Sequence, residues 1–493
     1  MKFLNMFTMY KGISMGLLAV WAVAFVGSFF GLIAYSPVAL VANLLVGVFS
    51  IWGASYVCGR IFNVSVHFES SLVTGLILAL IVTPSAGAGL IALLFAGIVA
   101  GVSKFVVVHN GRHIFNPAAL GAFVIGISGV GVVSWWVATP VLAPILFLVV
   151  LISLYKTRRM LIAGVFLAVS VPLLLVVFSS YGTALTDNLV LLLSFPILFI
   201  AGIMLTEPLT LPPRKWQMYV ESAIVGLLVV APFYVTTFEI TPALALLIGN
   251  VVALVFVLRS RIMLQLKSRV ALTPTTDELM FTPNKPIKFT AGQYLEVQIP
   301  HKKQDFRGAR RSFSMTTVPN TDEVGFGIRF YQPSSSCKKE LKAMPIGSIV
   351  SATGYWGDFV LPKDTTKPLL FVAGGIGITP FISHLKTIQN DEKRNIVLLY
   401  AVNNHDEIAY KDVLAKAGIK VIIVTKEKLK ELPFNWKQIR TSRLSEKDIA
   451  QYVTDVSLRY TYVSGPNLFV SASKKALRRL KAKRIKTDYF AGY

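Results

Sequence analysis

The first half of the chain consists largely of ten long apolar runs, and this feature restricts the fold more than any other. An α-helix needs ~20 residues to cross the hydrocarbon core of a bilayer, and the runs are close to that length. We expect membrane spans at residues 13–33, 39–58, 70–83, 87–107, 117–133, 140–155, 161–178, 188–204, 217–234 and 242–258. The first run lacks a cleavage site and nine more follow it, so it is expected to be a span and not a signal peptide.

The basic residues of this half support the same topology. All twelve Lys and Arg residues within 1–262 lie at the N-terminus, after even-numbered spans or at the exit of the tenth span. The loops on the other side contain none, as the positive-inside rule describes. The sequence therefore predicts a multi-pass protein of the cell (inner) membrane with both termini in the cytoplasm.

The second half is polar and strongly basic. Residues 263–493 contain 37 Lys and Arg against 20 Asp and Glu, a net charge of +17, whereas residues 1–262 carry 12 minus 5, or +7. A basic domain held beside a membrane suits the anionic cytoplasmic leaflet, so we expect lipid and not nucleic acid as its partner. With only Cys58 and Cys337 in the chain, neither a disulfide framework nor an ordinary four-cysteine iron-sulfur cluster is expected.

Two pairs of similar segments in the first half indicate an internal repeat. Residues 82–89 (VTPSAGAG) are similar to 205–212 (LTEPLTLP), and residues 116–126 (NPAALGAFVIG) are similar to 241–251 (TPALALLIGNV). The aligned prolines are 124 and 125 residues apart, and an odd number of spans separates the copies. This predicts an inverted repeat with interrupted helices. For each pair alone, proline and glycine that merely end a helix at a loop remain the alternative.

The loop motifs GRHIFNPAALG (111–121) and MLTEPLTLPPRKWQMY (204–219) resemble two membrane subunits, B of the sodium-pumping NADH:quinone oxidoreductase and D of the Rnf complex. The resemblance covers most of residues 10–260 and implies a flavin, FMN or riboflavin, bound within the bundle. The edge of the flavin ring would need hydrogen-bonding groups, and the phosphate of FMN would need a cation or a helix N-terminus. The residues implied as contacts are Arg112, Asn116, Thr206 and Glu207.

The same resemblance leaves the attachment of this flavin open. In the family, FMN is commonly esterified to the threonine of an Asp/Ser-Gly-Ala-Thr motif, which this sequence lacks between the spans; Thr139 is only a loose substitute. Non-covalent binding is therefore expected. Trp135 and Trp136 in the same outer loop are expected to be interfacial anchors. Glu221 enters an apolar run, so it belongs either to an ion or proton path or to the interface.

The second half divides into two domains by its strand pattern. Residues 268–300 alternate with period two between proline, glycine and asparagine breaks, which predicts a small antiparallel β-barrel. From residue 368 onward, buried strands alternate with glycine-rich turns and helices, which predicts a parallel α/β domain. We expect a membrane domain at 1–262, a barrel at 263–364 and a nucleotide-binding domain at 365–493.

This order of motifs resembles the ferredoxin-NADP reductase superfamily over essentially all of residues 265–493. The motif RSFS (311–314) takes the place of the family's Arg-x-aromatic-Ser. By that resemblance Arg311 neutralises the pyrophosphate of FAD, Phe313 lies against the isoalloxazine, and Ser314 hydrogen-bonds near N5. A second pyrophosphate loop, SSSCKKEL (334–341), supplies Ser335, Ser336 and Lys338.

The nucleotide side of the resemblance rests on three further segments. AGGIGITP (373–380) is a glycine-rich turn at a helix start, where close backbone approach to phosphates is possible. SGP (464–466) places a serine beside the nicotinamide, and Phe490 or Tyr493 covers the flavin face. The implied nucleotide-binding residues are Gly374, Gly375, Gly377, Thr379, Gly465 and Pro466, and the implied catalytic residues are Ser314, Ser464, Phe490 and Tyr493.

The choice between NADH and NADPH rests on the residues after the second parallel strand. Asp406 and Glu407 lie there and no arginine or lysine does, which favours NADH. Lys426, Lys428 and Lys430 keep NADPH open.

Taken together, the sequence predicts an oxidoreductase that passes electrons from cytosolic NAD(P)H through FAD to a membrane flavin. Quinone or another acceptor follows, with cation coupling and further redox subunits as possibilities. A small-solute transporter or channel with a redox-sensing module is the alternative. A two-haem reductase needs four membrane histidines, and only His67, His109 and His113 lie in this half. His384 and His405 are expected to be structural or surface residues and not metal ligands.

Overall fold

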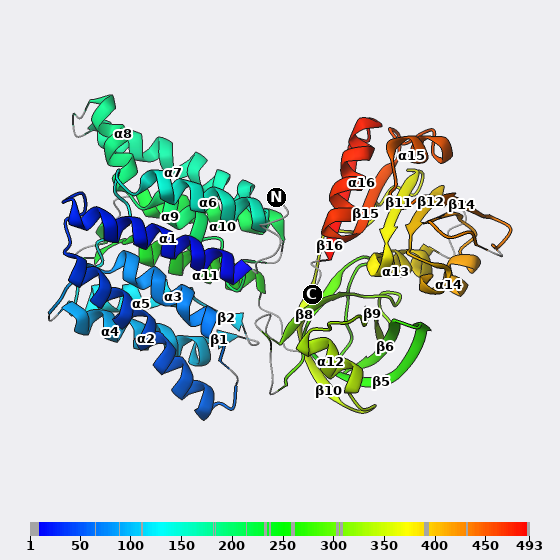
Figure 1. Ribbon diagram of the computed structural model, residues 1–493, viewed down its shortest axis with the longest axis horizontal. Coiled ribbons are helices and arrows are strands. Elements are labelled where there is room, and N and C mark those ends of the chain that lie inside the picture. The colour runs from blue at the N-terminus through cyan, green and yellow to red at the C-terminus, as the bar shows by residue number, and fades with distance from the viewer. Residues whose placement is uncertain are drawn as a thin grey trace. The chain divides into compact units, whose positions relative to one another are not determined.

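A computed structural model describes residues 9–490 except positions 65, 88, 110–111, 181, 183, 213, 231–233, 236–237, 258–261, 302–304, 306–308, 389–393 and 430–431. The chain forms two compact units, Met1–Leu258 and Arg259–Tyr493. Figure 1 labels the helices of the first unit and the two sheets of the second.

The first unit is helical. Its helices are α1 (Met9–Phe29), α2 (Pro37–Ile61), α3 (Phe68–Ile81), α4 (Gly89–Val106), α5 (Pro117–Ser128), α6 (Ala143–Thr157), α7 (Met160–Ser180), α8 (Leu185–Ser194), α9 (Ile197–Phe199), the π-helix η2 (Ile200–Met204), α10 (Lys215–Val230) and α11 (Pro242–Val257). Two short strand pairs complete it, β1 (Val108–His109) with β2 (Arg112–His113) and β3 (Tyr234–Val235) with β4 (Phe238–Glu239).

Every expected span overlaps a helical segment, but the count of ten spans is not confirmed. Four helices, α1, α2, α4 and α7, are long and apolar enough to cross a membrane. A fifth candidate is the pair formed by α8 and the α9–η2 segment, which bends by 49°. The helices α3, α5, α6 and α11 are apolar but shorter. Four to five helices of this chain could therefore cross a membrane by length and composition.

Helices of the two halves of this unit have matching packing partners. Helix α2 packs against α3 and α4, and α4 packs against α5; likewise α7 packs against α8 and α10, and α10 packs against α11. Gly101 and Gly226, 125 residues apart, lie at equivalent close contacts. A Cβ at Gly101 would be 2.7 Å from the Ala54 Cβ, and one at Gly226 would be 2.9 Å from the Phe166 carbonyl oxygen. Helices α4 and α5 thus repeat as α10 and α11 with about the offset found between the proline motifs.

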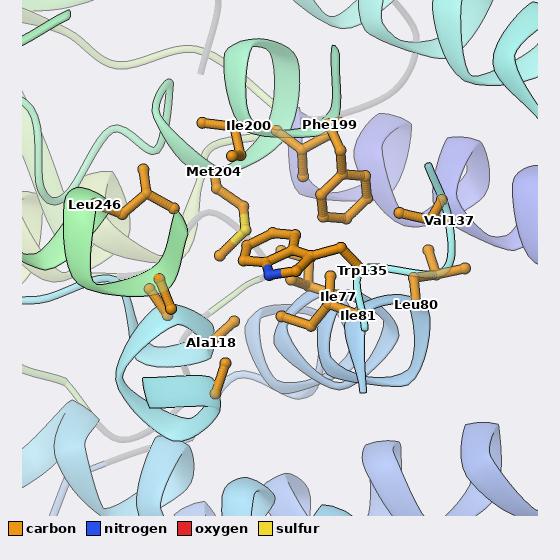
Figure 2. Close-up of a cluster of buried hydrophobic side chains, with 14 of the residues drawn as sticks. Ile77, Leu80, Ile81, Ala118, Trp135, Val137, Phe199, Ile200, Met204 and Leu246 are labelled. Carbon is orange, nitrogen blue, oxygen red and sulfur yellow. The ribbon is translucent and has the colours of Figure 1, made fainter. Parts of the chain in front are cut away.

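The expectation that Trp135 and Trp136 anchor the bundle at the membrane interface is wrong. Their side chains are 7% and 5% exposed, and the Trp136 indole donates a hydrogen bond to the Ala79 carbonyl oxygen at 3.0 Å. Figure 2 shows Trp135 among side chains of α3, α5, α9, η2 and α11. An antiparallel bridge between Val82 and Val133 holds the loop at the end of α3. The loop therefore enters the bundle, where both rings bury apolar surface.

The second unit begins with the expected antiparallel strands. They form a six-stranded sheet in the order β8-β7-β10-β5-β6-β9. The bounds are β5 (Ile262–Thr273), β6 (Thr276–Pro283), β7 (Tyr294–Gln298), β8 (Arg310–Ser314), β9 (Val324–Arg329) and β10 (Ile349–Trp356), with α12 (Ser336–Ala343) between β9 and β10. Met315, directly after β8, forms an antiparallel bridge with Phe326 of β9, which joins the two edges of the sheet.

The rest of the unit is the expected parallel α/β fold. Its sheet has the order β14-β13-β12-β11-β15-β16. The bounds are β11 (Leu369–Gly374), η3 (Gly375–Ile378), α13 (Thr379–Ile388), β12 (Ile396–Ala401), η4 (His405–Glu407), α14 (Lys411–Lys416), β13 (Lys420–Thr425), β14 (Trp436–Arg440), α15 (Glu446–Tyr452), β15 (Tyr460–Pro466), α16 (Asn467–Arg479) and β16 (Arg484–Phe490).

Both faces of this parallel sheet are buried. Phe371 of β11 packs in one core with Ile382 of α13, whereas the next residue, Val372, packs in another core with Val470 of α16. Successive side chains of a strand point to opposite faces, so helices cover the sheet on both sides. Ligands of such sheets bind at the carboxyl ends of the strands.

Candidate functional site

The glycine-rich turn follows the carboxyl end of β11, in the middle of the parallel sheet. Gly375 has a φ of +54°, a conformation that favours glycine. A Cβ at Gly377 would lie 2.5 Å from the Ser464 carbonyl oxygen and 2.6 Å from the Gly465 Cα. The turn and the end of β15 therefore touch through backbone atoms, and only glycine permits this approach. The turn leads directly into α13, where backbone N–H groups are available to an anion.

Ser464 ends up beside this turn because β11 and β15 are parallel neighbours, with Ala373 paired to Ser464. Its side chain is fully buried, and within the described residues its hydroxyl has no hydrogen-bond partner. Buried hydroxyls are normally satisfied, so this one suits a ligand atom. In the next strand Phe490 pairs with Pro466, so it lies at the same edge of the sheet. Tyr493 lies outside the described residues.

A carboxyl group that sequence reasoning missed also lies at this edge. Asp488 of β16 pairs in register with Ser464. Burial raises the pKa of its carboxyl to about 6, and the nearby Asp358 adds to this increase. The site therefore contains an acid whose charge changes just below neutral pH.

The predicted FAD residues meet around Asp305. The Arg311 side chain is 6% exposed, and its Nη2 lies 3.6 Å from Asp305 Oδ1. The backbone N–H of Ser336, at the start of α12, donates to Asp305 Oδ2 at 2.9 Å, and the Asp305 N–H donates to the Ser336 hydroxyl at 2.9 Å. A carboxylate thus contacts both an arginine and a helix N-terminus, the groups that bind phosphate.

The other residues of the predicted FAD site lie on the same two elements. Ser335 caps α12 and accepts a hydrogen bond from the Lys338 N–H at 3.4 Å, and the Lys338 ammonium lies 4.5 Å from the centre of the Tyr331 ring. On β8, the half-buried Phe313 ring is 5.6 Å from Phe326, and Ser314 is 7% exposed. Arg311, Ser335 and Ser336 are brought together on β8 and α12, whereas Ser464 lies on β15 of the parallel sheet.

Contacts between the antiparallel sheet and the α/β fold hold these two groups in one unit. The Ser383 hydroxyl of α13 donates to the Thr317 carbonyl oxygen at 2.7 Å, and the Tyr410 hydroxyl donates to Glu278 at 3.2 Å. The Thr379 hydroxyl donates to the Ile376 carbonyl oxygen at 3.0 Å and thereby fixes the start of α13. His384 of α13 is fully buried, so it is a structural histidine as expected; its Nε2 lies 2.9 Å from the Phe359 carbonyl oxygen.

Arg329 is a second residue that sequence reasoning missed. It ends β9, forms an ion pair with Glu407, and places its Nη1 3.5 Å from the position of a Cβ at Gly375. Glu407 also accepts a hydrogen bond from the Asn403 amide at 2.9 Å. The acidic residue that favoured NADH is therefore held beside the glycine turn by a partner from the other sheet. Such a partner, 78 positions away, leaves no local pattern in the sequence.

The four residues predicted to contact a membrane flavin also lie together. Arg112 donates to the Pro208 carbonyl oxygen at 3.0 Å, and the Asn116 amide donates to the Met204 carbonyl oxygen at 3.4 Å. Thr206 and Glu207 belong to the same segment. The two loop motifs that carry the resemblance are thus adjacent in space.

The cavity that Arg112 lines does not fit a flavin ring. This cavity is about 20 Å³ in volume, which is room for roughly one water, whereas pockets for such ligands measure roughly 300–1,000 Å³. Its lining comes from β1, β2, the following loops and α11, namely His109, Arg112, His113, Ile114, Leu209, Thr210, Leu211, Asn250 and Leu254. The described residues around Asn116 are held by protein hydrogen bonds instead.

Comparisons with known proteins agree with the second unit. Residues 371–475 match the family described as "Oxidoreductase NAD-binding domain". A flavohemoprotein of Bacillus subtilis (strain 168) is 24% identical over 203 residues, covering 40% of this chain and 50% of that protein. The reductase component of propane 2-monooxygenase from Mycolicibacterium goodii is 28% identical over 157 residues, covering 30% and 43% of the two chains. The chain thus spans about half the length of the curated relatives it matches.

Among solved structures, the FAD/NAD binding domain of nitric oxide dioxygenase from Vibrio cholerae O1 biovar El Tor superposes with a TM-score of 0.40 and 17% identity, covering 47% of this chain and 99% of that domain. The family match and the curated relatives show that the C-terminal part of the chain is a ferredoxin-NADP reductase-like module.

Proposed function

We propose that this chain is a membrane-bound oxidoreductase whose C-terminal module takes electrons from NAD(P)H through FAD and delivers them to an acceptor in the membrane. The observation that carries the proposal is the backbone contact between Gly377 and Ser464 at the carboxyl ends of two adjacent parallel strands. That contact leaves a glycine turn, a helix start and a buried hydroxyl together, which suits a nicotinamide dinucleotide.

FAD would be held by β8 and α12. Arg311 and the N-terminus of α12 present a guanidinium and backbone N–H groups, already placed around one carboxylate, that would bind its pyrophosphate. Phe313 and Ser314 follow on the same strand and would contact the isoalloxazine. When bound, FAD supplies hydride acceptance from the nicotinamide and release of single electrons.

NADH is the proposed electron donor. Glu407 is held near the glycine turn by Arg329, and its carboxylate would accept a hydrogen bond from a ribose hydroxyl but repel a 2′-phosphate. Ser464 would orient the nicotinamide, and Phe490 would cover the flavin until the nicotinamide binds. We expect kcat/KM for NADH to exceed that for NADPH in steady-state assays with a dye acceptor. A preference for NADPH would contradict the assignment of Glu407.

Quinone is the proposed acceptor. Electrons would enter from NAD(P)H at the nucleotide-binding domain, residues 365–493, and pass to FAD in the domain at 263–364. From there they would pass to the membrane domain, residues 1–262. The relative from Mycolicibacterium goodii is named as the reductase component of a monooxygenase, so it serves a separate partner. In this chain an apolar helical unit precedes the module. A second flavin in that unit is not part of the proposal, because the cavity beside Arg112 is too small for it.

The proposal is tested with the purified full chain in detergent. We expect a flavin absorption spectrum that NADH bleaches without oxygen and that added quinone restores. Arg311→Ala is expected to lose most of the bound FAD, whereas its neighbour Arg310→Ala, whose side chain pairs with Glu296, retains it. Equal flavin content in the two variants would contradict the FAD site. Bleaching by NADH without any reoxidation by quinone would instead favour the redox-sensing transporter or channel.

A further inference from the structure

Among the described residues of the membrane unit, Glu221 is the acidic side chain that is completely buried. Glu221 lies in α10 and its side chain is 0% exposed. Helix α11 covers it: a Cβ at Gly249 would be 3.6 Å from the Glu221 Cγ. The Asn250 amide is within hydrogen-bonding reach of the carboxyl, yet within the described residues neither oxygen forms a hydrogen bond of standard geometry. The interfacial alternative for Glu221 therefore does not hold.

Helices α7 and α11 pack most extensively against α10, and neither sequence contains an ionisable residue. No cation is therefore available from these two helices. The other ionisable residues of α10 itself, Lys215 and Tyr219, lie toward its start. An ionised carboxylate in these surroundings would be a buried charge without compensation, which is very costly. The group is stable here as the neutral acid, which carries a proton.

Packing does not require an acid at this position. The offset of 125 residues that relates Gly101 to Gly226 places Ala96 opposite Glu221 and Ile125 opposite Asn250 in the first half of the repeat. Ala96 and Ile125 are both 0% exposed. The two positions aligned by this offset are thus apolar and buried in one half and an acid and an amide in the other. The polar pair is therefore present for a purpose other than packing.

A polar route leads from this acid toward the loops. The Asn250 Oδ1 accepts a hydrogen bond from the Asn116 N–H at 2.8 Å, which fixes the amide between α5 and α10. Asn250 also lines the water-sized cavity beside Arg112, whose lining includes His109 and His113. A water in such a polar cavity would find several hydrogen-bonding partners. One amide then separates that cavity from the Glu221 carboxyl.

We propose that Glu221 is a proton-binding site inside the membrane unit, which exchanges its proton with water that enters from the cavity beside Arg112 and is hydrogen-bonded by Asn250 on the way. The proton is transferred between water and a carboxylate oxygen, and no electron transfer is involved in the exchange. A proton is favoured over a metal cation because the described residues offer one carboxyl and one amide here, too few oxygens for a dehydrated ion. Intramembrane acids of this kind commonly mark proton relays.

The first test uses dicyclohexylcarbodiimide on the full chain in lipid vesicles. The reagent enters apolar regions and attacks only un-ionised carboxyls. The acid proton moves to a carbodiimide nitrogen, the carboxyl oxygen bonds to the central carbon, and the product rearranges to an N-acylurea without losing an atom. Mass spectrometry is expected to find the adduct at Glu221. The adduct is expected to be absent in Glu221→Gln, while Glu69→Gln, the matched control in α3, keeps it.

Two outcomes would overturn the site. The first is a chain that reacts at other carboxyls but never at Glu221 between pH 5 and pH 9 (roughly the range over which a buried acid changes charge). The second is protection of Glu221 by sodium chloride but not by choline chloride, which would make the site a cation site instead. Neither result depends on FAD, NADH or quinone, so the proposed function and this inference can fail separately.

The route is tested by replacing Asn250 with the residue found at the equivalent position of the first half. In D₂O, the infrared C=O band of the Glu221 acid shifts as its proton exchanges. Asn250→Ile is expected to slow this exchange at least tenfold, because the amide link is removed. Thermal unfolding and circular dichroism establish that the variant is folded. An unchanged exchange rate in a folded variant would rule out the route through Asn250.

Discussion

At the scale of single residues, Asp305 has an unusual position for an acid. Its carboxylate contacts Arg311 and the N–H of Ser336, which are the groups proposed to bind the FAD pyrophosphate. An anion already occupies the place where a second anion must bind. FAD therefore has to displace this carboxylate or bind against its charge.

Asp305→Asn is expected to tighten FAD binding by about 1 kcal/mol, or roughly fivefold in Kd, because the competing charge is removed. Flavin fluorescence during titration of the apoprotein measures this. Glu296→Gln is the control, because Glu296 pairs with Arg310 and not with Arg311. Weaker FAD binding in Asp305→Asn would show that Asp305 positions Arg311 instead of competing with the flavin.

The glycine turn gives a graded prediction. Gly377→Ala places a methyl group 2.5 Å from a backbone oxygen, whereas Gly374→Ala places one 2.6 Å from the Phe469 ring, which can rotate away. Overpacking of this kind costs about 1–3 kcal/mol. We expect kcat/KM for NADH to fall roughly tenfold or more in Gly377→Ala and less in Gly374→Ala, with FAD content unchanged in both. The opposite order would contradict the turn geometry.

His384 makes the stability of the second unit depend on pH. Its burial lowers the pKa of the imidazole from 6.5 to about 3, so the folded chain keeps it neutral while the unfolded chain takes up a proton below pH 6.5. Stability is therefore complete above pH 6.5 and decreases as the pH falls toward 3. Between pH 7 and 5.5 the loss is expected to be about 1 kcal/mol.

Chemical unfolding at the two pH values measures this loss. His384→Gln is expected to remove that part of the pH dependence. The exposed His405 provides the control, since His405→Gln should leave the pH dependence unchanged. An equal pH dependence in wild type and His384→Gln would contradict the assignment.

Local motifs were predictable at this scale, and long-range partners were not. Four of the predicted site residues belong to short sequence motifs that indicate a chemical role, namely Arg311, Ser336, Gly377 and Ser464. The structure places them in two groups. Asp305 and Arg329 contact partners far along the chain, and no periodicity or spacing indicates such contacts. The roles assigned to these residues in catalysis remain predictions.

At the scale of elements, helices α5 and α11 begin in the same way. Each starts with proline after a capping residue: the Asn116 Oδ1 accepts from the Ala119 N–H at 3.0 Å, and the Thr241 hydroxyl accepts from the Leu244 N–H at 3.2 Å. Asn116 is buried and also donates to the Met204 carbonyl oxygen, whereas Thr241 is exposed.

Loss of a cap costs about 0.5–2 kcal/mol. Asn116→Ala also removes the buried hydrogen bond from the side-chain amide to the Met204 carbonyl oxygen, so it is expected to destabilise the unit by about 1 kcal/mol more than Thr241→Ala. Thermal unfolding of the two variants in the same detergent compares them. A larger effect of Thr241→Ala would show that the contacts of Asn116 add nothing to stability.

The spacing and length of the apolar runs predicted the positions of the helices of the first unit, but they did not predict the residue at which each helix ends. Helix α3 ends at Ile81 and α5 ends before Gly129, which has a φ of +68°. Hydropathy continues across both ends, so the expected span 117–133 was too long and the expected span 70–83 was displaced by two residues toward the C-terminus. The residues beyond α5 instead return into the bundle, and this is why two tryptophans assigned to the interface are buried.

At the scale of the whole molecule, the predicted topology places alternate loops on opposite sides of the membrane. The two native cysteines, Cys58 and Cys337, are both buried. Labelling of an introduced cysteine can therefore be measured without interference from them. Met160 after α6 is 44% exposed and is predicted to face the cytoplasm, whereas Val130 after α5 is 49% exposed and is predicted to face outward.

An impermeant maleimide is expected to label Val130→Cys in intact cells and Met160→Cys only after permeabilisation, because the reagent cannot cross the bilayer. Labelling efficiency in detergent provides the reference for each variant. The reverse pattern would invert the topology and place the module outside. Equal labelling of Val130→Cys and Met160→Cys in intact cells would show that the two positions lie on the same side of the membrane, which contradicts the predicted single crossing between them.

The division into an apolar half and a nucleotide-binding half was predictable, because the halves differ in composition and in the spacing of their apolar residues. The electron acceptor and the route between the halves could not be predicted from the sequence. They depend on the shapes of surfaces, which the spacing of apolar residues does not describe. The membrane flavin shows this limit: its predicted contacts do lie together, yet the cavity that Arg112 lines has room for roughly one water.

Trp135 offers a practical consequence of the buried loop. Its ring packs against Phe199, with a centroid distance of 6.5 Å, and lies beside Met204 of the bent π-helical segment (Figure 2). Indole emission shifts in colour and intensity with the polarity and quenching groups around the ring. In a variant whose other six tryptophans are replaced by phenylalanine, emission from Trp135 would therefore report movement of the broken helix in real time without an attached dye.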